Sequence, residues 1–232
     1  MKILSKTGKE ACAIHFCGYS KKNLSSYLYR MSQQTVMKPS NATIITFAQE
    51  HLYYPLIEQL TKSGISYVNL AEDIIGWENT LKPSLILQSL EKVTTEYAVI
   101  LDAADVVLTE SFSDIVELYQ TYGKDILFSG NSVQYPNVPL DSLTSRECWG
   151  TEKYINSGCI IGKKAALKTF FTAVVAGGNE NNKWKSDQYM VRAVFDAYKD
   201  IAAIDYYSKC FQSVIGHFIL PMDETSTNYI IE

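Results

Sequence analysis

Short apolar runs alternate along the chain with segments in which apolar residues recur at helical spacing. Most of these runs lack polar residues at every second position, which is typical of strands that helices cover on both faces. We expect strands over residues 11–16, 42–48, 65–70, 97–101, 125–129 and 153–162. The tail after residue 200 predicts one more strand and short ordered segments.

The segments between these strands carry the start and stop signals of helices. Pro83 stands where the first turn of a helix would lie, and Gly64 and Gly123 follow helical patterns as stops. We expect helices over residues 51–64, 82–93, 111–123, 163–176 and 187–198. Strands that alternate with helices in this way predict an α/β fold with a mostly parallel sheet flanked by helices.

The chain has 232 residues, which suits one α/β domain and is short for two. No linker rich in proline, glycine or serine divides the sequence. We therefore expect a single domain, in which residues 1–40 add a lead-in strand and helix to a main unit over 41–232. Residues 131–150 have no periodic pattern and predict a long irregular loop, and loops of that length in compact domains tend to be functional.

Composition excludes several classes of function. The net charge is −4 and lysine and arginine do not cluster, so a nucleic-acid groove is not expected. The N-terminal segment has no apolar core long enough for a signal peptide, and no apolar run approaches the roughly 18 residues of a spanning helix. We expect a soluble, cytoplasmic protein without a transmembrane segment.

The five cysteines are odd in number, and none of them forms a CxxC pair. Neither a structural zinc site nor a disulfide framework is therefore expected. Reduced and mostly buried thiols are the prediction.

Two aspartates interrupt the apolar stretch VILDAADVVL at residues 99–108. An unpaired carboxylate in an apolar setting is costly, so Asp102 and Asp105 stand at a solvated strand end or hold a positive charge. Ligands of open α/β sheets gather at the carboxyl ends of strands, where two carboxylates would bind a divalent cation that bridges a diphosphate. A solvated acidic turn is the alternative.

A phosphatase of the haloacid dehalogenase type also begins with an apolar strand and two aspartates. In that class the two acids lie two residues apart, whereas the spacing here is three, and no later acidic pair completes a magnesium site. This interpretation therefore stands behind that of a nucleotide-binding site.

Two later motifs also carry polar groups that a ligand would use. Asn156 and Ser157 are followed by Gly158, which allows a ligand to approach the backbone closely. Ser186 is placed to cap a helix whose first turn holds Asp187 and Gln188, and a carboxylate there often serves only the helix dipole. Taken singly, the two motifs are compatible with an ordinary turn and an ordinary helix start.

The order of these motifs resembles one family. A strand that ends in DxxD, the run LFSG at 127–130, a loop with Trp149, YINSG at 154–158, a helix and the pair DQ follow one another. This order is similar to that of the glycosyltransferase domain of the procollagen lysyl hydroxylases and their viral and bacterial relatives. The resemblance runs from residues 42–48 to 205–216, and it implies a GT-A-like (Rossmann-like) nucleotide-sugar fold.

The resemblance implies a binding site for a uridine nucleotide. Phe47, Ala48 and Gln49 would border the base, and Trp77 would pack near the uridine. Lys82 would reach the phosphates or would merely be solvated.

The resemblance also implies a metal site. Asp102 and Asp105 would bind the metal, and Ala103 and Ala104 stand where the family often has an aromatic residue, so one contact to the base is lost. The family takes a third ligand from a later histidine, for which His217 would substitute or would be a structural residue.

Catalytic roles follow from the same resemblance. Asn156 would hydrogen-bond the donor sugar or the acceptor, and Asp187 with Gln188 would stand at the reacting carbon. Phe211 and Gln212 match the FQ pair near the end of the family domain.

The sequence therefore predicts a glycosyltransferase that moves a hexose from a UDP-sugar to a hydroxyl group of a saccharide or another acceptor. Its cofactor would be manganese(II) or magnesium, held by Asp102, Asp105 and His217. The main alternative is a protein that binds a nucleotide-sugar without catalysis.

Overall fold

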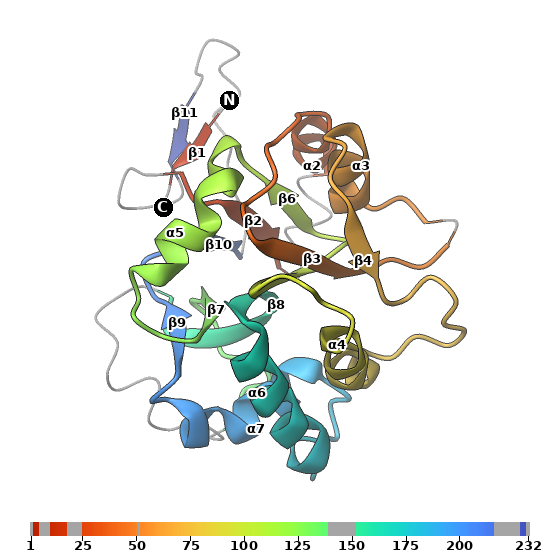
Figure 1. Ribbon diagram of the computed structural model, residues 1–232, viewed down its shortest axis with the longest axis vertical. Coiled ribbons are helices and arrows are strands. Elements are labelled where there is room, and N and C mark those ends of the chain that lie inside the picture. Colours follow the sequence, from red (N-terminus) through yellow and green to blue (C-terminus); the bar gives the residue numbers. More distant parts are fainter. Residues whose placement is uncertain are drawn as a thin grey trace.

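A six-stranded sheet forms the centre of the computed structural model, which describes residues 2–4, 10–17, 25–50, 52–138, 152–215 and 228–230 (Figure 1). β8 runs antiparallel to both of its neighbours, and all other neighbours in this sheet are parallel. The predicted mostly parallel α/β sheet is therefore confirmed. In spatial order its strands are β4 (Tyr67–Asn69), β3 (Ala42–Phe47), β5 (Tyr97–Asp102), β8 (Tyr154–Lys163), β7 (Ile126–Asn131) and β9 (Ala202–Asp205).

Helices cover both faces of this sheet (Figure 1). Successive residues of β5 enter different cores: Val99 and Leu101 pack with helices on one face, and Ile100 packs with helices on the other. Both faces of the strand are thus apolar, which explains why the run lacks polar alternation. The first face carries α3 (Pro55–Lys62) and α5 (Ile115–Gln120), and the second carries α4 (Lys82–Leu90), α6 (Lys164–Gly177) and α7 (Asp187–Phe195).

A second sheet of three strands joins segments that are far apart in the sequence. β2 (Ala13–Phe16) lies between β10 (Phe211–Val214), to which it is parallel, and β6 (Val106–Leu108), to which it is antiparallel. Helix α2 (Ser25–Ser32) packs against this sheet through a separate cluster of buried residues. A parallel pair, β1 (Lys2–Leu4) and β11 (Asn228–Ile230), completes the described strands.

The structure differs from the predicted elements in several places. β6 was not expected, because its residues continue the apolar run after the two aspartates; pairing with β2 makes it a separate strand. The helix predicted over 111–123 divides into the short helix η2 (Glu110–Asp114) and α5, with Thr109 accepting a hydrogen bond from the Ser111 amide at 3.2 Å. β7 extends to Asn131, into the predicted loop. Two further short helices are η1 (Asn79–Leu81) and η3 (Asp196–Tyr198).

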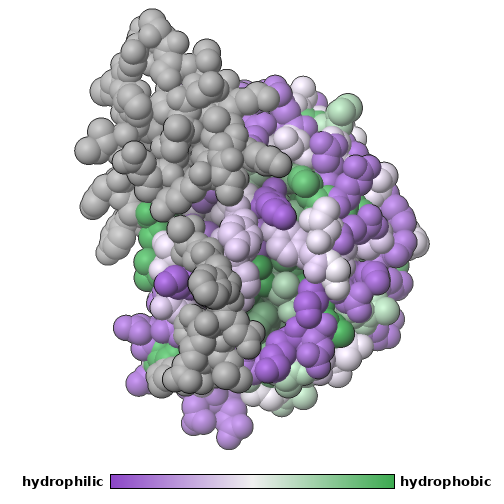
Figure 2. Space-filling model, turned by 90° about the vertical axis from the view of Figure 1, so that its left-hand side faces the viewer, coloured by the Kyte–Doolittle hydropathy of each residue, from purple (hydrophilic) through white to green (hydrophobic). Residues whose placement is uncertain are grey.

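Within the described part of the chain, no helix is both long enough and apolar enough to cross a membrane. On the face drawn in Figure 2, hydrophilic residues are widespread, and hydrophobic residues form small separate groups among the described atoms. The division of the domain at residue 40 stays a prediction, although β2 is an integral strand of the second sheet.

Candidate active site

A pocket of about 650 Å³ brings most of the predicted site residues together. Its walls come from the ends of β3 and β5, the start of α4, the first half of β8 and the start of α7. Its location at strand ends agrees with the general position of ligand sites in open α/β sheets. The predicted residues that line it are Phe47, Gln49, Trp77, Lys82, Asp102, Ala103, Ala104, Asp105, Asn156, Asp187 and Gln188.

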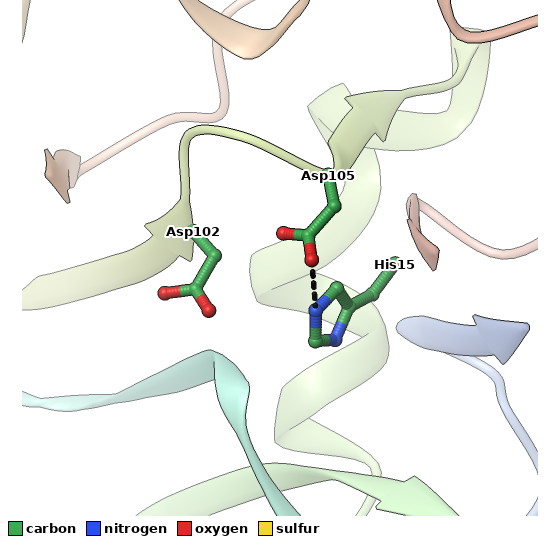
Figure 3. Close-up of side chains that lie close together, drawn as sticks. All are labelled: His15, Asp102 and Asp105. Carbon is green, nitrogen blue, oxygen red and sulfur yellow. Dashed lines mark ion pairs between the residues drawn. The ribbon is translucent and has the colours of Figure 1, made fainter. Parts of the chain in front are cut away.

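The two aspartates occupy the connection between β5 and β6. β5 ends at Asp102, and Ala103 and Ala104 form the turn that leads to Asp105. Figure 3 shows the two carboxylates with the imidazole of His15 beside them. One ligand atom of each of these three residues lies within 4.8 Å of the others.

His15 reaches this position through the second sheet. It lies opposite Val106 in the antiparallel pair of β2 and β6, so its side chain is next to Asp105. The distance from His15 Nε2 to Asp105 Oδ2 is 3.4 Å (Figure 3). The sequence prediction of the site did not include His15. Its position as a polar residue within an apolar strand was the only signal for it in the sequence.

The imidazole of His15 is enclosed on its other sides. Its Nδ1 lies 3.4 Å from Cys17 Sγ, and Asn156 Nδ2 donates to the same sulfur at 3.5 Å. A Cβ on Gly158 would lie 2.1 Å from the Cε1 of the ring. The close approach that Gly158 allows is therefore used by the ring of His15, and Gly158 also lines the pocket.

Charge governs the protonation of His15. Burial by itself lowers the pKa of the imidazole, but the charges of Cys17 and Asp105 outweigh burial and raise the pKa well above its usual value. The site therefore attracts positive charge, which is also a property of a cation site.

Lys82 connects two acids across the pocket. Its Nζ donates to Asp102 Oδ1 at 2.5 Å and to Asp187 Oδ2 at 3.2 Å. Burial lowers the pKa of this amine, but the two carboxylates raise it above its ordinary value. Lys82 is 7% exposed, so it is not the solvated lysine that the sequence left open.

Asp187 lies at the start of α7 without capping it. The cap is Ser186, whose Oγ accepts a hydrogen bond from the Tyr189 amide at 3.3 Å. The Asp187 carboxylate turns to the pocket and also accepts from Ser157 Oγ at 2.8 Å. The arrangement favours a role in the pocket over a role in the helix dipole.

The amides of Asn156 and Gln188 are partly engaged within the chain. Asn156 Oδ1 accepts from the Gly158 amide at 2.7 Å, and Gln188 Nε2 donates to the Tyr135 carbonyl at 2.7 Å. These bonds hold the pocket wall on both sides of Asp187. Tyr135 itself also lines the pocket.

Aromatic rings form another wall of the pocket. The rings of Phe47 and Trp77 lie 5.8 Å apart at an interplanar angle of 45°. Gln49 lies nearby and donates to the Ile74 carbonyl at 3.2 Å. Ala48 is buried next to this wall but does not line the pocket itself.

Among the described residues, two other predicted positions do not line the pocket, and a third prediction falls outside them. Phe211 and Gln212 are buried in β10, where Gln212 Nε2 donates to the Ser213 carbonyl at 2.9 Å. His217 lies outside the described residues. The imidazole found beside Asp102 and Asp105 is that of His15.

The donor set at the acidic turn fits a divalent metal ion. Carboxylate oxygens suit magnesium and manganese. A neutral imidazole nitrogen is compatible with manganese and other transition metals, so metal binding here would release the proton that the raised pKa keeps on His15. Asp102, Asp105 and His15 would hold the ion, and the Lys82 ammonium lies beside it as a second positive group.

The sequence of the chain identifies its family. The family model described as "PLOD GT domain" matches residues 76–219, more than half of the chain. The chain therefore belongs to the PLOD glycosyltransferase-domain family, and the resemblance noted in the sequence is confirmed. The match contains Trp77, Lys82, the two aspartates and Asp187, whereas Phe47 and His15 precede it.

Other comparisons add little. None of the curated proteins matches the chain. A solved structure titled "Crystal Structure of A197 from STIV" has 20% sequence identity and a TM-score of 0.38, and the match covers 57% of this chain and 68% of that one. A TM-score this low supports no argument about fold or function.

Proposed function

We propose that this glycosyltransferase domain transfers a hexose from a UDP-sugar to a hydroxyl group, with manganese(II) or magnesium as its cofactor. The observation that carries the proposal is the cluster of His15, Asp102 and Asp105 in one pocket with Asp187. Family membership supports the transferase class, and the cluster supports the dependence on a metal.

The aromatic wall is the proposed site of the uracil base. Phe47 and Trp77 offer ring faces, and stacking on an aromatic ring contributes about 1–3 kcal/mol per base in nucleic-acid-binding proteins. Gln49 and Ala48 would border the base. The diphosphate would then extend from this wall toward Lys82 and the two aspartates.

The acidic turn is the proposed metal site, with Asp102, Asp105 and His15 as ligands. When bound, the metal ion neutralises the negative charge that develops on the departing diphosphate. Lys82 adds a positive charge at the same place. His217, which the sequence offered as third ligand, is replaced by His15 in this proposal.

Asp187 is the proposed group at the reacting carbon. In the reaction the bond between the sugar carbon and the diphosphate oxygen breaks, its electron pair leaves with the diphosphate, and the acceptor oxygen bonds to the carbon. Asp187 accepts the proton of the acceptor hydroxyl, or it stabilises the positive carbon while that proton passes to the departing diphosphate; the two roles correspond to inversion and retention. Asn156 and Gln188 would position the sugar and the acceptor.

The test is the release of UDP from a panel of UDP-hexoses with manganese and no added acceptor, because slow hydrolysis reports the donor without knowledge of the acceptor. We expect one donor to release UDP and the Asp102→Asn variant to lose that release. Asp73→Asn is the matched control, since Asp73 is exposed and does not line the pocket.

Failure to release UDP from any donor in the panel, although UDP binds in the presence of manganese, would contradict catalysis. That outcome would favour a non-catalytic protein that binds nucleotide-sugars. Release that does not depend on manganese or magnesium would contradict the metal site.

A further inference from the structure

Lys82 holds an unusual position for a lysine. Its ammonium group is buried and donates to two carboxylates, while its Nζ also lies 5.4 Å from the centre of the Phe47 ring. One of those carboxylates, Asp102, is a proposed metal ligand, and the other, Asp187, is the proposed group at the reacting carbon. A single amine thus neutralises groups that two different parts of the reaction require.

A metal ion and Lys82 compete for Asp102. The Nζ is 2.5 Å from Asp102 Oδ1, so the ammonium already holds one of the two oxygens of a carboxylate at the acidic turn. A divalent cation at Asp102 and Asp105 would be placed close to this ammonium, and like charges repel strongly where water is excluded. Metal binding therefore requires that Lys82 weaken or give up its bond to Asp102.

We infer that Lys82 is the resident counterion of the ligand-free pocket, and that it is released from Asp102 to the diphosphate when metal and donor bind together. The inference rests on the proposed function, because it takes Asp102 as a metal ligand and a diphosphate as the neighbouring group.

The release of Lys82 makes the two ligands depend on each other. A metal ion alone must displace an ammonium that keeps Asp187 as a carboxylate partner. A diphosphate alone would be repelled by the negative carboxylates of Asp102, Asp105 and Asp187. When both ligands bind, the metal ion neutralises the charge of the carboxylates, and the diphosphate neutralises the charge of Lys82. Each ligand therefore raises the affinity of the pocket for the other.

The same ion pairs have a role before any ligand arrives. Without the amine, the buried carboxylate of Asp187 and the half-buried carboxylate of Asp102 would lose a cation, which is destabilising where water is largely excluded. Lys82 thus stabilises the two carboxylates and also makes them resist a lone metal ion.

The test measures manganese affinity by calorimetry, with and without UDP, in the parent and in Lys82→Met. Methionine retains an unbranched side chain against Phe47 and removes the charge. We expect manganese alone to bind on the order of tenfold more tightly to the variant, and UDP to raise manganese affinity by a factor on the order of tenfold smaller than in the parent. Thermal unfolding gives a second readout: manganese should raise the melting temperature of the variant more than that of the parent.

Lys185→Met is the matched control, because it removes the same charge from an exposed lysine that pairs with Glu78 at 2.7 Å. It should leave both manganese affinity and the effect of UDP unchanged. If Lys82→Met does not fold, the same comparison is made in the Asp187→Asn background. There, one of the two carboxylates that lose Lys82 as a partner is replaced by a neutral amide.

The outcomes separate this inference from the proposed function. Manganese that binds the parent and Lys82→Met equally, or binds the variant more weakly, overturns the counterion role and leaves the metal site standing. A parent that binds no manganese with or without UDP overturns the metal site and the counterion role together.

Discussion

The contact between Gly158 and His15 provides a sharp test of the metal site. An alanine Cβ at position 158 would lie 2.1 Å from His15 Cε1, whereas ordinary contacts begin at 3.4 Å. The difference means that the imidazole must move by about 1.3 Å, since the added carbon is fixed to the backbone of β8. Metal–ligand distances tolerate only about 0.2 Å.

Gly158→Ala should therefore remove His15 from the metal site. We expect manganese affinity, measured by calorimetry with UDP present, to fall about 10- to 100-fold, the loss typical of a disturbed metal ligand. Overpacking of the ring should also lower the free energy of unfolding by about 1–3 kcal/mol. Gly177→Ala is the control, because a Cβ there meets no atom within 4 Å.

A double-mutant cycle shows whether the loss acts through His15. In His15→Ala the ring is absent, so adding Gly158→Ala should cost little further manganese affinity. Coupling between residues in contact reaches about 0.5–3 kcal/mol. Equal losses from Gly158→Ala in the presence and the absence of the imidazole would refute the reasoning, because the alanine would then act without moving His15.

Three further predictions concern other parts of the pocket. Trp77→Ala should weaken UDP binding about 10- to 100-fold, as expected for a lost stacking contact of about 1–3 kcal/mol. In the parent, UDP should quench the tryptophan fluorescence. If the variant binds UDP as tightly as the parent, Trp77 has only a structural role. Asp187→Asn should lower kcat on the order of a hundred-fold or more with donor affinity nearly unchanged; a normal kcat would shift the role to Asn156 and Gln188. Removal of divalent metal with a chelator should abolish both UDP release and tight UDP binding, and calorimetry that shows unchanged UDP affinity would contradict the bridging role of the metal.

The sequence predicts the main sheet because its strands are apolar on both faces and are separated by helices with clear ends. It also predicts that Asp102 and Asp105 belong to a binding site, because unpaired carboxylates directly after an apolar strand are energetically costly. Most residues implied by the family resemblance line one pocket, because the strand ends and helix starts that bear them meet at one edge of the sheet.

The remaining parts of the site depend on contacts between distant segments. His15 reaches Asp105 through the pairing of β2 with β6, which no local pattern signals. The Lys82–Asp187 bond joins positions 105 residues apart. The sequence also could not decide whether Asp187 caps its helix; the structure assigns the cap to Ser186 and turns Asp187 to the pocket.

Anomalous diffraction from a crystal of the chain with manganese and UDP tests the metal site, the central claim, most directly. We predict one strong manganese peak within about 2.0–2.6 Å of carboxylate oxygens of Asp102 and Asp105 and of His15 Nε2, with the UDP diphosphate on the same ion and the Lys82 ammonium within hydrogen-bond distance of that diphosphate. A manganese peak away from these residues, or a bound UDP without manganese at the acidic turn, would contradict the account.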